Sequence, residues 1–125
     1  WSISMGIEGG EIIEVSTEGT DTEGFYSQAT GFQVHEITSG PGNDGAVSAV
    51  ILSMMEPVFF PKNTTQTLVK LKVKILLPHE GSETLRLFFV DGMKGGGQPV
   101  ENILVVKAAS VYAELGECIM TVSAD

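Results

Sequence analysis

The chain is poor in cysteine, in basic residues and in long apolar runs, three features on which large classes of proteins depend. Its single cysteine, Cys118, leaves no partner for an internal disulfide. Lysine and arginine number 7 against 16 aspartates and glutamates, so the formal net charge is −9. Nucleic acids and anionic membrane surfaces are bound through clustered basic residues, so we expect neither as a partner. No apolar run approaches the roughly 20 residues that span a bilayer, and we expect no membrane insertion.

Aromatic side chains and catalytic motifs are equally scarce. One tryptophan, two tyrosines and six phenylalanines offer few stacking platforms for a sugar or for a glycosidase cleft. The two histidines, His35 and His79, stand far apart and neither has a neighbour at the spacing of zinc ligands. No Gly-x-Ser-x-Gly elbow occurs. The sequence therefore predicts no enzyme, and it ranks carbohydrate binding behind protein binding.

The chain does contain enough apolar residues for one core. Its 125 residues are 42% hydrophobic and 18% charged, which separates it from disordered tails and fits a single domain over residues 1–125. A closed chain of 13.3 kDa should expose roughly 6,500 Å² to solvent. No shift in composition along the chain suggests a second domain.

The clearest local pattern is a strict alternation of residue type over 68–77. Successive side chains of a β-strand point to opposite faces of the sheet, so this segment predicts a half-buried strand. Its apolar face carries five large aliphatic residues, and its polar face carries Lys70, Lys72 and Lys74. This basic stripe suits an acidic patch on a protein partner. Lysines on an exposed strand also keep that strand soluble and discourage wrong pairing, and both interpretations stay open.

Similar short runs recur along the chain between clusters of glycine, proline and asparagine. Such clusters break strands because glycine tolerates positive φ and proline fixes φ near a turn value. Many short strands without an apolar stripe of helical period favour an antiparallel all-β fold, a jelly-roll β-sandwich of about eight or nine strands. The expected strands cover residues 1–7, 12–15, 32–37, 46–54, 68–77, 85–90, 100–107, 110–113 and 117–123.

Two of these runs carry an expectation about burial. Residues 46–54 are apolar on both faces, which predicts a strand covered on both sides, although periodicity alone leaves a short helix open. In the last run, Cys118 alternates with Met120 and Val122. We expect these three side chains on the inner face of the sandwich, with Cys118 as a small buried apolar residue.

Acidic residues and one sequon complete the candidate sites. Asp21 and Glu23 lie in a short acidic loop that supplies some of the oxygen ligands calcium requires. The loop lacks the length and the terminal glutamate of an EF-hand, so an acidic solvated surface without a cofactor is the default expectation. Asn63 begins Asn-Thr-Thr in an expected turn, which matches the N-glycosylation pattern in a source that glycosylates exported proteins.

Three segments together resemble the cohesin-like domains of bacterial extracellular proteins. They read WSISMGI at 1–7, GAVSAVILS at 45–53 and FVDGMKGGGQPVEN at 89–102, in matching order over nearly the whole chain. The resemblance implies an exported jelly-roll sandwich, located outside the cell or at its surface. It also implies docking of a calcium-bearing partner module, dockerin, although no residue set here carries over the docking face of well-studied cohesins.

The same resemblance implies a further strand before Trp1. A sandwich without that strand exposes apolar side chains and a row of unpaired backbone groups. Either the strand lies upstream in the same protein, or a neighbouring subunit donates it, as in donor-strand complementation. Repeated head to tail, such a donation builds a filament. We therefore expect a non-catalytic assembly module whose partner is an identical subunit or a separate docking module.

Overall fold

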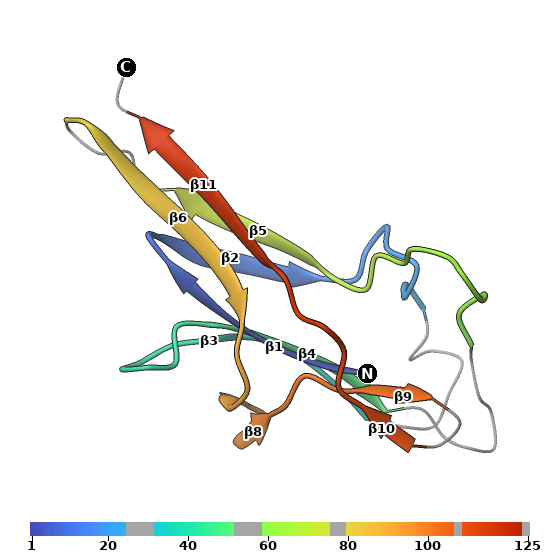
Figure 1. Ribbon diagram of the computed structural model, residues 1–125. Coiled ribbons are helices and arrows are strands. Elements are labelled where there is room, and N and C mark those ends of the chain that lie inside the picture. Colours follow the sequence, from blue (N-terminus) through green and yellow to red (C-terminus); the bar gives the residue numbers. More distant parts are fainter. Residues whose placement is uncertain (25–31, 52–58, 76–79, 107–108, 124–125) are drawn as a thin grey trace.

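The computed structural model describes residues 1–24, 32–51, 59–75, 80–106 and 109–123, and within these ranges the chain is all-β (Figure 1). Every strand pair is antiparallel, which confirms the expected class of fold. No helix in the described ranges is long and apolar enough to cross a membrane. The strands are β1 (Ser2–Glu8), β2 (Gly10–Ser16), β3 (Phe32–Thr38), β4 (Gly45–Ile51), β5 (Lys70–Ile75), β6 (Ser82–Phe89), β7 (Met93–Gly95), β8 (Gln98–Val100), β9 (Leu104–Val106), β10 (Ala109–Val111) and β11 (Glu117–Ser123).

The largest sheet has five strands in the order β11-β6-β1-β4-β3. β2 and β5 form a separate two-stranded sheet, and the hairpins β7–β8 and β9–β10 are two more. Figure 1 shows β11 and β6 running side by side as a long pair, with β5 and β2 beside them. The two-stranded sheet packs through its apolar side chains on one face of the five-stranded sheet.

β4 lies between β1 and β3 and is buried on both faces, as its apolar residues predict. Its side chains at Ala46, Ser48 and Val50 face the two-stranded sheet, and those at Val47 and Ala49 face the opposite way. The pairing with β1 and β3 over this segment settles the choice between strand and helix in favour of the strand.

The first core lies between the two sheets and holds Ile7, Ile12, Ala46 and Leu85, with Leu71 and Val73 of β5 packed against it. Simple alternation along β2 would not place both of its core residues on one face, because Ile12 and Val15 are three positions apart in the sequence. A bulge at Ile13 shifts the register, so that both Ile12 and Val15 reach the core. Burying a large aliphatic side chain stabilises the fold by about 1.5–3 kcal/mol.

A second core lies on the opposite face of the five-stranded sheet. Val34, Val47, Ala49 and Met93 form it under the β7–β8 hairpin. The expectation of two sheets around a single interior is therefore incomplete: the central sheet is apolar on both faces, so it needs cover on both. Gly96 and Gly97, with φ of 61° and 78°, form the two-residue turn of this hairpin, a conformation that glycine adopts without strain.

The strand expected over residues 100–107 is wrong, because the chain breaks at Asn102 into β8 and β9. The Asn102 side chain turns back to accept a hydrogen bond from the Ser4 backbone N–H (2.8 Å) and to donate one to Asp91 Oδ1 (3.0 Å). Ser4 Oγ in turn accepts the Met93 N–H at 3.1 Å. Asp91, Asn102 and Ser4 thus form a polar clasp that ties the β7–β8 hairpin to β1.

The Asn102→Ala variant should lose about 2–3 kcal/mol of unfolding free energy. Alanine leaves the buried Ser4 N–H without its acceptor and removes one of the two bonds to Asp91. The matched control is Asn43→Ala, whose side chain caps the exposed Lys94 N–H and should cost under about 1 kcal/mol. Urea unfolding of both variants measures the difference, and equal losses would contradict the clasp.

Candidate interaction surface

Exposed large apolar side chains gather in the C-terminal part of the chain. Eight of the twelve that the described residues show belong to residues 104–120, and Tyr112 is 66% exposed. The sequence predicts strands over most of these residues, and an inner-face position only for Met120 among them. The run Leu104-Val105-Val106 shows no polar alternation, which was the one available signal that it is not an ordinary half-buried strand. We call these eight residues together the C-terminal apolar surface, although Ile119 and Met120 lie on opposite faces of β11: Leu104, Val105, Val106, Val111, Tyr112, Leu115, Ile119 and Met120.

The chain as a whole exposes more surface than a closed domain of its mass. Its accessible surface is 8308 Å², against roughly 6,500 Å² expected at 13.3 kDa. The chain thus encloses less of its surface than a closed domain of this size.

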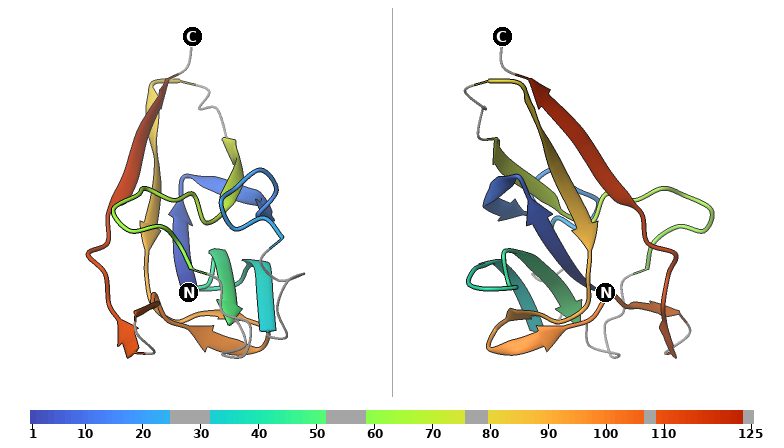
Figure 2. Two further views of the ribbon diagram at one scale, coloured as in Figure 1. Left: turned by 90° about the vertical axis from the view of Figure 1, so that its right-hand side faces the viewer. Right: turned by 60° about the vertical axis from the view of Figure 1, so that its left-hand side comes forward.

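β11 is the least covered strand of the central sheet. It forms one edge of that sheet, pairs only with β6 among the described strands, and stands at the outside in both views of Figure 2. Directly opposed residues share a face, so Met120 lies beside Leu85 and Cys118 beside Leu87. Leu85 is 1% exposed whereas Met120 is 41% exposed. Cover from the two-stranded sheet therefore does not extend over Met120 and Cys118 of β11.

This finding corrects the expectation for Cys118. The alternation with Met120 and Val122 does place all three on the inner face, beside β6 residues that face the core. Only Val122 packs against the core, however, and Cys118 is exposed. The pattern of the sequence gives the face on which a side chain lies, but burial also needs a second layer opposite that face.

The outer face of the same strands carries a charged cluster. Arg86 Nε donates to Glu117 Oε2 at 2.6 Å, and its Nη1 lies 3.6 Å from Glu8 Oε2. The guanidinium also lies over the Phe88 ring, 4.3 Å from its centroid. The hydrogen bond to Glu117 and the nearby carboxylates raise the pKa of Arg86. Arg86 thus covers part of the outer face of β6. On the inner face, Cys118 and Met120 of the neighbouring strand β11 are exposed.

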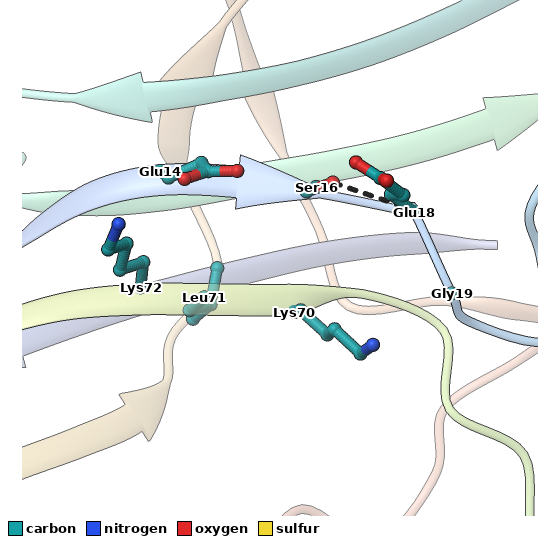
Figure 3. Close-up of a pocket in the computed structure, with 7 residues that line it drawn as sticks. All are labelled: Glu14, Ser16, Glu18, Gly19, Lys70, Leu71 and Lys72. Atoms are coloured by element: carbon teal, nitrogen blue, oxygen red, sulfur yellow. Dashed lines mark hydrogen bonds between the residues drawn. The ribbon is translucent and has the colours of Figure 1, made fainter.

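β5 presents Lys70, Lys72 and Lys74 on its exposed face, as the alternation predicts. Across the β2–β5 pair these lysines lie opposite Ser16, Glu14 and Glu11. Figure 3 shows the two strands with Glu14 and Glu18 on one side and Lys70 and Lys72 on the other. These residues line an open depression of about 490 Å³. None of the three lysines lies within 4.0 Å of a carboxylate oxygen of the described residues.

The two candidate calcium ligands, Asp21 and Glu23, each accept a hydrogen bond from a backbone N–H of a loop. Asp21 Oδ2 accepts the Thr67 N–H at 2.7 Å, and Glu23 Oε2 accepts the Gly19 N–H at 3.0 Å. Within the described ranges, no three histidine, cysteine, aspartate or glutamate side chains gather at a spacing that could hold a metal ion. Asn63 is exposed in its turn, with φ of 56°, and its side chain is accessible to a modifying enzyme.

One histidine has a contact that the sequence did not reveal. His35 Nδ1 lies 2.9 Å from Ser48 Oγ across the β3–β4 pair, and its Nε2 lies 3.2 Å from Gln33 Oε1. Ser48 is 2% exposed, so its hydroxyl is closed to a substrate, and the partner of Nε2 is an amide instead of a carboxylate. We assign this pair to packing of the sheet. His79 lies outside the described residues.

Burial lowers the pKa of His35 below its ordinary value of 6.5. The unfolded chain then binds more protons than the folded chain below about pH 6.5, so stability falls as the pH decreases through that region. Because His35 is only half-buried, the loss should be a few tenths of a kcal/mol. Urea unfolding at pH 7.5 and 5.5, in a His79→Gln background, should show a smaller pH dependence once His35→Gln is added. An unchanged dependence would show that His35 does not contribute.

Comparison with known protein families, with curated proteins and with solved structures finds no match to this chain.

Proposed function

We propose that this chain is a non-catalytic, extracellular assembly module that self-associates through its C-terminal apolar surface. The gathering of exposed apolar side chains over residues 104–120 is the observation that carries the proposal. Burying such side chains against another protein removes apolar area from water, at about 25 cal/mol per Å². Exposed apolar side chains in such number near one end of a chain favour a site of protein contact.

The finer architecture belongs to the same proposal. A cohesin-like jelly roll completed by a donated strand, in a cell-surface structure or an extracellular filament, would account for the exposed inner face of β11. The net charge of −9 keeps such a subunit soluble before assembly. The acidic surface also agrees with a chain that binds neither nucleic acid nor an anionic membrane.

Sedimentation velocity over a wide range of concentrations tests this proposal. The mean mass should rise with concentration, and Val105→Lys together with Ile119→Lys should shift association to at least tenfold higher concentration, because each places a charge in an apolar contact. Phe59→Lys is the matched control, since Phe59 is 80% exposed but lies outside this surface. A monomer at every concentration would refute self-association, and an equal effect of the control would refute the assigned surface.

A second candidate function is the capture of a separate protein, such as a module of dockerin type. The three β5 lysines beside an unpaired strand edge favour it, because they offer positive charge to an acidic partner. A chain that remains monomeric but retains a distinct protein from its native medium would fit capture. Loss of that binding on calcium chelation would indicate a calcium-bearing partner.

A further inference from the structure

The two sheets do not have equal widths, and the narrower one ends early on the β11 side. β2 contacts β3, β4 and β1, and Leu71 and Val73 of β5 pack against the first core, to which β6 contributes Leu85. The second sheet thus covers the central sheet from β3 as far as β6, and on β11 it covers Val122 alone. Neighbouring strands lie about 4.8 Å apart in any sheet. One more strand beside β5 would therefore lie over the inner face of β11.

β5 has the backbone groups to accept that strand. It pairs with β2 along one edge, and no other described strand pairs with its second edge. In a two-stranded sheet, each strand directs about half of its N–H and C=O groups away from its partner. Among the described residues, the second edge of β5 is thus an unpaired row of donors and acceptors. Cys118 and Met120 of β11 are exposed on the face of the central sheet that the two-stranded sheet covers elsewhere.

The side chains of β5 determine which residues the added strand should contain. Leu71, Val73 and Ile75 point to the core side, and Lys70, Lys72 and Lys74 point to solvent. Directly opposed residues of paired strands share a face. An added strand therefore needs apolar side chains beside the first set and acidic side chains beside the second. A second copy of β5 would place lysine opposite lysine, which opposes self-pairing at this edge.

We infer that the free edge of β5, with the inner face of β6 and β11, is an acceptor site for an extended strand of alternating acidic and apolar residues. The added strand pairs with β5, covers Cys118 and Met120, and places its carboxylates beside the lysines. This inference rests on the proposed assembly function and names the site and the chemistry of the partner. The existing pairing of β2 with β5 already sets acidic residues opposite the lysines, since Glu11 and Glu14 lie opposite Lys74 and Lys72.

Binding of a labelled peptide in which glutamate alternates with valine tests the inference, with fluorescence anisotropy as the readout. The intact chain should bind this peptide, and should bind neither a lysine–valine peptide nor a scrambled peptide of the same composition. Lys72→Gln with Lys74→Gln should weaken binding about fivefold, as expected for two exposed charge pairs. The matched control, Lys62→Gln with Lys94→Gln, removes the same charge elsewhere and should leave binding unchanged.

Backbone pairing has its own test, which does not depend on the folding of a variant. Two peptides carry N-methyl groups on alternate residues, one on the odd positions and one on the even positions. Only one set of N–H groups points at β5, so one of these peptides should lose binding and the other should keep it. Hydrogen exchange should also slow at the β5 amides that do not bond to β2. Equal binding of both N-methylated peptides would overturn strand addition.

The outcomes separate this inference from the proposed function. Self-association without peptide binding, unaffected by the β5 lysine variants, would refute the acceptor edge and leave the assembly function standing. A monomeric chain that binds the peptide would support the acceptor edge and refute self-association. Self-association abolished by Lys72→Gln with Lys74→Gln would identify the donor as a strand of a second copy, and would support both. A monomeric chain without peptide binding would refute both.

Discussion

Gly45→Ala should lower the free energy of unfolding by about 3 kcal/mol, because the added methyl group meets backbone. Gly45 lies opposite Gly6 where β4 pairs with β1. A Cβ at this position would run into the carbonyl group of Met5, and only movement of β1 could relieve the overlap. Overpacking of this kind costs about 1–3 kcal/mol, with the larger values where no side chain can yield. Chemical denaturation measures the loss.

Gly116→Ala is the matched control for that substitution. Gly116 has no neighbour that an added Cβ would meet within 4 Å, and its φ lies outside the left-handed region. The same change there should alter stability by less than about 0.5 kcal/mol. Comparable stability of the two variants would mean that β1 and β4 do not pair in the register described here.

Leu85→Ala and Met120→Ala should have very different effects although the two residues are neighbours on one face. Leu85 is almost fully buried in the first core, and its truncation should cost about 3–4 kcal/mol through lost burial and a cavity. Met120 lies opposite it on β11 and is exposed, so its truncation should cost under about 1 kcal/mol in the isolated chain. Thermal or urea unfolding of both variants, at a concentration where the chain is monomeric, gives the comparison.

The same two variants also test whether the inner face of β11 is covered in the isolated chain. If a second layer covered β11 in the isolated chain, Met120→Ala would approach the cost of Leu85→Ala. In the presence of a strand partner, Met120→Ala should weaken association, because the added strand buries this side chain. A Met120→Ala variant with a loss above about 2 kcal/mol as a monomer would therefore contradict the open face.

Much of the strand pattern followed from the sequence. Alternation located β1, β2, β3, β5, β6 and β11. The apolar residues of 46–54 indicated a strand covered on both faces, which the structure confirms over 46–50, while residues 52–54 lie outside the described residues. These patterns succeed because the period of two is a property of the strand itself. The bulge at Ile13 could not be read in this way, since it depends on how β2 fits against β5.

The polar clasp and the open face depend on partners distant in sequence. Asp91 follows one expected strand and Asn102 lies within the strand expected over 100–107, and only the fold brings them to Ser4 of β1. Cys118 and Met120 looked like core residues because their alternation is regular. Alternation cannot tell whether an opposing layer exists, and here the second sheet stops before it reaches them.

Cys118 provides the most direct measurement of the central claim, that the inner face of β11 is open until another strand covers it. It is the single cysteine of the chain and is exposed on that face. In the dilute monomer, a thiol reagent should label it within about tenfold of the rate for the denatured chain. The glutamate–valine peptide should slow labelling at least tenfold. Slow labelling of the monomer, or a rate that the bound strand leaves unchanged, would contradict the account.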